Sequence, residues 1–123
     1  MLRGLFTIKS TSAEGTSAFT TKAAMNANHP VFQGHFPGTP VLPGVCSLYL
    51  IRTCTELFPG CSLRYHRVES CKFTAMIDPL RNEVITVQGN IKKDEEGIQI
   101  KALMLYGNST VLKLQATMKE ITL

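Results

Sequence analysis

Apolar and polar residues alternate along much of this 123-residue chain, most clearly near its end. Over residues 110–123 two sets of side chains point in opposite directions: Leu112, Leu114, Ala116 and Met118 in one, and Lys113, Gln115, Thr117 and Lys119 in the other. A period of two with one apolar face is typical of a strand in an antiparallel sheet. The pattern therefore predicts a strand here that buries one face.

Similar segments, rich in β-branched and aromatic residues, occur elsewhere in the chain. Strands are predicted over 64–77, 84–92 and 98–106, separated by the breaks "DPLRNE", "KDEEG" and "GNS". Near the start, residues 4–11 and 16–26 predict a hairpin whose turn is "SAEG". The chain outside its middle segment therefore reads as a set of antiparallel strands.

The segment from Val45 to Phe58, "VCSLYLIRTCTELF", has no such alternation. Apolar side chains cover most of the circumference that a helix would have here. A helix of this kind is normally wrapped by other structure. The pair Pro59 and Gly60 ends it, with Gly60 placed for a left-handed cap.

These elements predict an α+β fold in which a curled antiparallel sheet wraps around one long central helix. The length favours one domain over residues 1–123, and 44% hydrophobic with 18% charged residues is ordinary for a globular protein. We expect a cytoplasmic protein without a membrane span. The first ten residues lack the features of a secretory signal, and no apolar run is long enough to cross a bilayer.

Charge and cysteine content change this picture little. The formal charge of +4 and the pI near 9.0 favour an acidic partner, such as an acidic carrier protein, or serve solubility alone. Because the basic residues are scattered, we expect no nucleic-acid partner. The four cysteines form no C-x-x-C pair, so we expect no metal site and interpret Cys46 and Cys54 as core thiols.

One stretch, "HPVFQGHFPGTPVLPGV", concentrates glycine and proline around His35, directly before the predicted helix. Its G-H-F-P-G core and its second turn, P-V-x-P-G-V, resemble the signature of the 3-hydroxyacyl-acyl carrier protein dehydratases. Those enzymes have the hotdog fold. The segment "VESCKFTAMIDPLRNEV" resembles a strand and bend of the same family, with Leu80 where glycine is usual.

The resemblance implies roles for individual residues. It makes His35 the catalytic base, which suits a side chain that is largely neutral at pH 7. It gives the backbone N–H of Gly44 to the thioester carbonyl, at a helix start where N–H groups lack internal partners. We expect Phe32, Phe36, Gly38 and Val45 to contact substrate, although core packing alone would also explain the two phenylalanines.

The match fails fourteen positions after the histidine, where the family carries Glu or Asp and this chain has Tyr49. Tyr49 could donate to the leaving hydroxyl, His35 could act alone, or dehydration could be lost. Glu56 is the only carboxylate of the predicted helix and lies too far along it to substitute. We expect His29 to be at the surface.

We therefore expect a hydro-lyase that resembles 3-hydroxyacyl-carrier-protein dehydratases in fatty acid or related lipid synthesis. The partner would be an acyl carrier protein or acyl-CoA. No cofactor is implied, because the substrate brings its own phosphopantetheine. The family is dimeric, so the site would combine His35 and Gly44 of one chain with Tyr49 of another, in a homodimer or a trimer of dimers. A non-catalytic acyl-carrier binding module and a hotdog thioesterase remain the alternatives.

Overall fold

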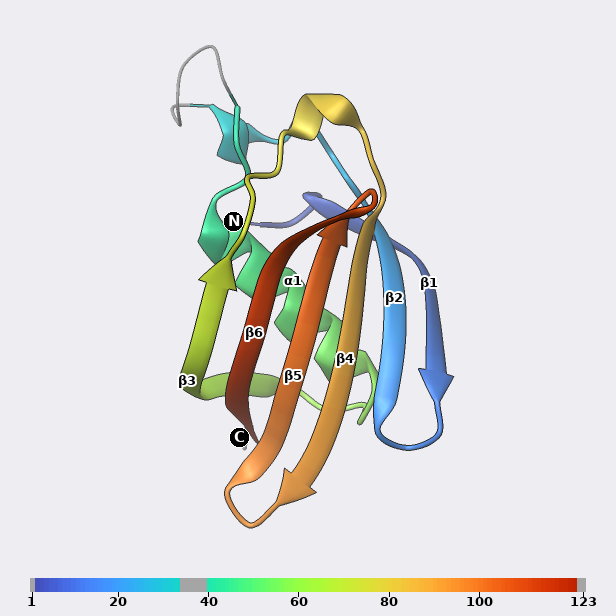
Figure 1. Ribbon diagram of the computed structural model, residues 1–123, viewed down its shortest axis with the longest axis vertical. Helices are drawn as coiled ribbons and strands as arrows, with labels where there is room; N and C mark the ends of the chain where they lie inside the picture. Colours follow the sequence, from blue (N-terminus) through green and yellow to red (C-terminus); the bar gives the residue numbers. More distant parts are fainter. Residues whose placement is uncertain (1, 34–39, 122–123) are drawn as a thin grey trace.

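One helix and six antiparallel strands make up the regular structure of this computed structural model, which describes residues 2–33 and 40–121 (Figure 1). In chain order the elements are β1 (Phe6–Glu14), β2 (Ala18–Met25), the 3₁₀ turn η1 (Pro30–Phe32), α1 (Gly44–Leu57), β3 (Leu63–Phe73), the 3₁₀ turn η2 (Pro79–Arg81), β4 (Ile85–Asp94), β5 (Gly97–Tyr106) and β6 (Ser109–Glu120). The predicted α+β class is confirmed. No helix among the described residues is long and apolar enough to cross a membrane.

The strands form one sheet in the order β1-β2-β4-β5-β6-β3, and every pairing is antiparallel. Strands β4, β5 and β6 follow one another as a meander. Strand β3, which directly follows the helix, instead pairs with β6 at the edge of the sheet (Figure 1). The helix lies across one face of the sheet (Figure 1). Strands β1 and β3 form the two edges of the sheet.

The alternation predicted for the last strand is confirmed. The four residues Leu112, Leu114, Ala116 and Met118 are each at most 4% exposed and face the helix. Thr117 lies on the other face, yet it is also buried. Its hydroxyl bonds to Glu69 and Gln99, both at 2.7 Å, and these side chains cover it. The core therefore lies between the helix and the inner face of the sheet.

Two boundaries differ from the prediction. The first hairpin turns at residues 15–17, because residues 12–14 continue β1 and pair with the start of β2. The third predicted strand ends at Phe73 rather than at Ile77. Thr74 still bonds to β6, since its N–H donates to the Val111 carbonyl at 2.9 Å. Residues 75–77 follow outside the strand, and the Leu42 N–H, just before the helix, donates to the Ile77 carbonyl at 3.0 Å.

The helix begins after Pro43, whose fixed φ of −62° precedes the first helical residue. It ends as predicted, since Gly60 has a φ of +74° and its N–H bonds back to the Glu56 carbonyl at 2.9 Å. Within one chain the curled sheet covers part of the helix surface and leaves the rest exposed. Val45 is 69% exposed and Leu57 is 53% exposed, because the sheet covers only one side of α1.

Candidate active site

The glycine- and proline-rich motif is described only at its two ends. Residues 34–39, which include the predicted site residues His35, Phe36 and Gly38, lie outside the described residues. The chain approaches the motif through η1 and leaves it at Pro40, which leads into α1. The site can therefore be built from the elements on either side of the motif.

A pocket of about 310 Å³ lies at the beginning of α1. It is lined by Val41, Leu42, Gly44, Ser47, Phe73, Ala75, Met76, Ile77 and Val111. These residues come from the motif's exit, the first turn of the helix, the segment after β3 and the start of β6. The volume is at the lower end of the range for small-molecule sites, and most of the lining is apolar.

Gly44 is the first residue of α1 and forms part of this lining. Among the described residues no side chain caps the helix, and no acidic residue lies in its first turn. The positive end of the helix dipole therefore faces the pocket without a neutralising carboxylate in that turn. A side chain at Gly44 would approach Phe73, since a Cβ there would lie 2.8 Å from the ring's Cζ atom. Glycine thus leaves room for both the ring and a ligand.

Sequence reasoning missed Ser47 and Phe73 as lining residues. Ser47 follows Gly44 by three positions, so both lie on one face of the helix. That spacing was the only available signal. Phe73 reaches the pocket from β3, and no local pattern brings it to Gly44.

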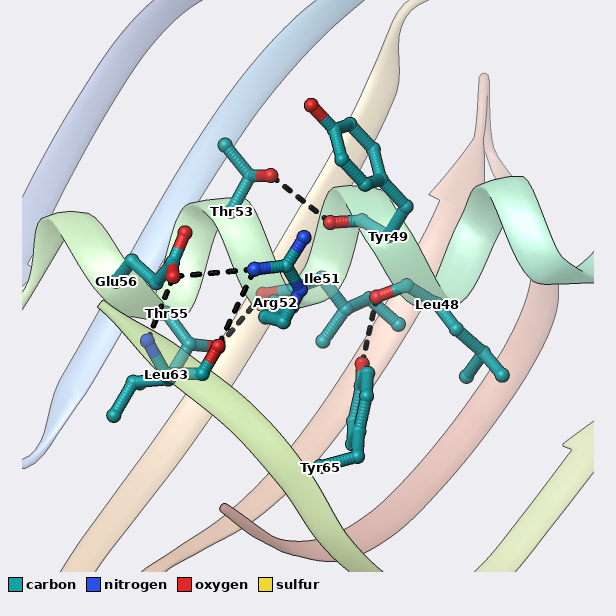
Figure 2. Close-up of polar contacts among 9 residues, drawn as sticks. All are labelled: Leu48, Tyr49, Ile51, Arg52, Thr53, Thr55, Glu56, Leu63 and Tyr65. Atoms are coloured by element: carbon teal, nitrogen blue, oxygen red, sulfur yellow. Dashed lines mark hydrogen bonds and ion pairs between the residues drawn. The ribbon is translucent and has the colours of Figure 1, made fainter. Parts of the chain in front are cut away.

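Tyr49 lies on a different side of the helix. It lines a separate groove of about 620 Å³ together with Leu2, Arg3, Gly4, Phe6, Ile8, Leu50 and Thr53. In Figure 2 its ring and that of Tyr65, which comes from β3, lie on opposite sides of α1. The guanidinium carbon of Arg52 lies 5.3 Å from the centre of the Tyr49 ring. Within one chain, Gly44 and Tyr49 therefore do not share a pocket.

Glu56 holds the helix against β3. Its Oε2 accepts hydrogen bonds from the Leu63 N–H at 2.7 Å and from Arg52 Nη1 at 3.2 Å (Figure 2). Arg52 Nη1 also donates to the Leu63 carbonyl at 3.3 Å. A carboxylate with these contacts is a structural anchor, which agrees with the expectation that Glu56 does not replace the missing acid.

A second anchor lies closer to the pocket. The Tyr65 hydroxyl donates to the Leu48 carbonyl at 2.7 Å (Figure 2). Burial raises the pKa of Tyr65 well above its usual range, so the phenol stays protonated and remains a donor. This hydrogen bond fixes the helix to β3, a strand at the edge of the sheet.

The remaining predicted contact residues are placed as follows. Phe32 is 9% exposed and packs into the hydrophobic core. Val45 points outward from the helix, away from the pocket that Gly44 lines. Contact between either side chain and substrate stays a prediction.

The expectation of a surface His29 is wrong, because the side chain is only 7% exposed. Its Nδ1 accepts from the Val31 N–H at 3.0 Å, so Nε2 carries the proton and donates to the Arg3 carbonyl at 2.9 Å. The imidazole therefore joins the N-terminal segment to η1, which leads into the motif. The partners are backbone groups, one of them 26 residues away, and the sequence shows neither.

One basic side chain of β3, that of Arg67, is engaged by two carboxylates. Arg67 pairs with Glu69 at 2.9 Å and with Glu96 at 3.1 Å. Hydrogen bonds from Thr117 and from Arg67 hold the pKa of Glu69 below its usual value.

Across residues 2–33 and 40–121, no group of three or more His, Cys, Asp or Glu side chains is arranged to hold a metal.

Comparison with known proteins gives a consistent result. The family model for the ApeI-like proteins, described as ApeI dehydratase, matches residues 10–114. The 3-hydroxyacyl-[acyl-carrier-protein] dehydratase FabZ of Syntrophomonas wolfei is 29% identical over 102 residues, which cover 73% of this chain and 71% of the relative. The FabZ of Latilactobacillus sakei is 35% identical over 81 residues, covering 60% of this chain and 58% of the relative.

Solved structures share the fold. The dehydratase heterocomplex ApeI:P from Xenorhabdus doucetiae contains a chain that matches with a TM-score of 0.75 at 14% identity, over 93% of this chain and 97% of that one. An uncharacterized protein from Erwinia carotovora matches with a TM-score of 0.70 at 17% identity, over 94% of each chain. The predicted hotdog fold is confirmed. Because the family model covers most of its length, the chain belongs to the ApeI-like dehydratase family.

Proposed function

We propose that this protein removes water from a 3-hydroxyacyl thioester carried on an acyl carrier protein, giving the trans-2-enoyl thioester. One observation carries the proposal. An apolar pocket is lined by Gly44 in the first turn of α1, which no described side chain caps, nine residues after the motif histidine His35. Family membership and the FabZ relatives support the same reaction class.

The chemistry suits this position. Dehydration begins when a base removes the proton from C2, next to the thioester carbonyl, and negative charge moves to the carbonyl oxygen. The N–H of Gly44 and the positive helix end would stabilise that charge, and one well-placed donor contributes roughly 3 kcal/mol. We assign the base to His35 on the strength of the motif.

Tyr49 would complete the site from a second chain. It cannot reach the pocket beside Gly44 in its own protomer, because it lines the groove on another side of α1. The chain also leaves apolar surface uncovered, including Val45 on the helix and Val68 on β3, which is 44% exposed. A two-fold pairing of chains would cover this surface, so we expect a homodimer or a trimer of such dimers.

The carrier is expected to bind through charge. The chain has a formal charge of +4, which favours association with an acidic protein. Phosphopantetheine on that carrier would bring the acyl group, so the reaction as proposed needs no cofactor of the protein's own. Acyl-CoA contains the same arm and is the alternative donor.

A non-catalytic acyl-carrier binding module is the second candidate. It is favoured by the tyrosine at position 49 and by Glu56, whose carboxylate is engaged by Arg52 and Leu63. No described carboxylate therefore lines the pocket beside Gly44. The module would keep the pocket and the fold while lacking turnover.

Hydration of a trans-2-enoyl carrier-protein thioester, followed by mass spectrometry of the carrier, tests the proposal. We expect the hydrated product from the unaltered protein, its loss in His35→Ala, and its retention in Glu56→Gln. Acyl-carrier binding without any turnover would establish the binding module instead. Release of the free carrier thiol would identify a thioesterase, the third possibility.

A further inference from the structure

Ser47 is the one residue of the described pocket lining whose side chain carries oxygen or nitrogen. It is 3% exposed, and the side chains around it belong to apolar residues from three other segments. A buried hydroxyl without a partner costs free energy, so its presence in an apolar pocket needs a reason.

The hydroxyl makes no hydrogen bond to any described residue. The two threonines of α1 bond to the carbonyl four positions earlier, Thr53 to Tyr49 at 3.0 Å and Thr55 to Ile51 at 2.7 Å. Ser47 lacks this common helical bond among the described residues. Among all described residues, every fully enclosed side-chain oxygen or nitrogen has a hydrogen-bond partner. The Ser47 Oγ has no such partner, so it is not fully enclosed and opens to the pocket that Ser47 lines.

Helix geometry places this hydroxyl beside Gly44. Cα–Cβ bonds in an α-helix tilt toward its N-terminus, and a side chain covers the turn before its own Cα. Ser47 follows Gly44 by three positions, so the two residues are neighbours on one face. The Ser47 hydroxyl and the Gly44 N–H therefore both reach the same end of the pocket.

We infer that the Ser47 hydroxyl is a second donor to the thioester carbonyl oxygen, alongside the Gly44 N–H. This inference rests on the proposed dehydration. When the base takes the C2 proton, the electron pair moves onto the carbonyl oxygen and gives an enolate. The pair then returns to form the C2=C3 double bond, the C3–O bond breaks, and the hydroxyl leaves as water with a proton from the general acid. Ser47 keeps its own proton throughout.

A second donor matters more in this chain than in one with a carboxylic acid on the helix. A phenol is a weaker acid than a carboxylic acid, so Tyr49 would assist the leaving hydroxyl less than a carboxylic acid does. Stronger stabilisation of the enolate lowers the barrier to the earlier step, the removal of the C2 proton. Two donors at the carbonyl would therefore offset part of the missing acid's effect.

The test compares enoyl-thioester hydration by the unaltered protein, Ser47→Ala, Ser47→Thr and Thr55→Val. For Ser47→Ala we expect kcat to fall about 100-fold with KM changed less than about 3-fold, because the bond strengthens as charge develops. Ser47→Thr keeps the hydroxyl and should recover most of kcat. Thr55→Val removes a buried hydroxyl of the same helix that does not line the pocket, so its kcat should stay near that of the unaltered protein.

The possible results separate the two proposals. Unaltered kcat in Ser47→Ala, or a raised KM with unchanged kcat, overturns the role of Ser47 and leaves the dehydratase in place. No turnover by the unaltered protein refutes the proposed function itself. If Ser47→Ala does not fold, Ser47→Cys serves instead: the thiol is a weak donor of similar size, so a lowered kcat supports the inference and an unchanged kcat refutes it.

Discussion

Replacement of Gly89 by alanine is expected to destabilise the fold through one contact. Gly89 lies on the inner face of β4, directly opposite Phe19 of β2 on one side and Ala102 of β5 on the other. A Cβ at this position would clash with the Phe19 ring and would lie 3.1 Å from the Ile100 Cδ1 atom. The glycine therefore provides the space that the phenylalanine fills.

The Phe19 ring has little room to move away. It is 3% exposed, and its centre lies 5.8 Å from that of Phe58, the residue that follows the helix. Overpacking of a filled core costs about 1–3 kcal/mol. Alanine lowers the entropy of the unfolded chain and returns about 0.4–1 kcal/mol, because Gly89 does not have a positive φ. The net expectation is a loss of about 1–2 kcal/mol in the free energy of unfolding.

Urea unfolding followed by far-ultraviolet circular dichroism measures this change, since the chain has no tryptophan. The midpoint should fall while the slope stays constant, at one fixed protein concentration. Phe19→Leu in both backgrounds completes a double-mutant cycle. A smaller side chain at 19 should relieve the clash, so the double variant should lose at least about 1 kcal/mol less than the sum of the single losses. Full stability in Gly89→Ala, or strict additivity, would refute the packing argument.

Three further outcomes follow from the structure. Gly44→Ala should fold normally, because the exposed end of the Phe73 ring can move by the roughly 0.6 Å needed. Enoyl hydration should fall at least about 10-fold, because the added methyl group fills part of the pocket. Retained activity with normal folding would refute the placement of Gly44 in the site. Burial raises the pKa of Cys54 from 9.0 to about 11, so the thiol loses its proton more readily in the unfolded chain and stability falls above pH 9. Between pH 8 and pH 10 the free energy of unfolding of the unaltered protein should therefore drop by about 1.4 kcal/mol more than that of Cys54→Ala. Equal drops in the two proteins would contradict this. His29→Ala leaves the Val31 N–H without its acceptor and should cost about 1–3 kcal/mol in urea unfolding, whereas a loss below about 0.5 kcal/mol would show that the imidazole does not anchor η1.

The elements of this fold could be predicted from local patterns, whereas their pairing could not. Alternation in the last strand and the apolar run after Pro43 reflect interactions within a few residues, which a sequence displays directly. The position of β3 beside β6 depends on which partner buries its apolar face best. That choice involves residues 39 to 57 positions apart, such as Leu63 and Glu120 at the upper end, and leaves no local trace.

The candidate site shows the same division. The motif drew attention to Gly44 because its glycines and prolines lie within a short stretch whose spacing resembles a family signature. Phe73, Ile77 and Val111 reach the pocket only through the path of the chain after β3 and the start of β6. Ser47 was visible as a polar residue of an apolar helix, but its meaning depends on the pocket that surrounds it. His29 was misjudged because its partners are backbone atoms, which no side-chain pattern reveals.

The two sides of α1 explain why a single chain cannot contain the whole proposed site. Gly44 and Ser47 open to the pocket under Phe73, whereas Tyr49 opens to the groove beside Phe6. A general acid must lie within hydrogen-bond reach of the leaving hydroxyl, and a residue of the same helix on another face does not meet that requirement. The exposed Val45 marks the surface between the two sides. Under the proposed dehydration a second chain supplies the Tyr49 of this site, so assembly and turnover should be lost together.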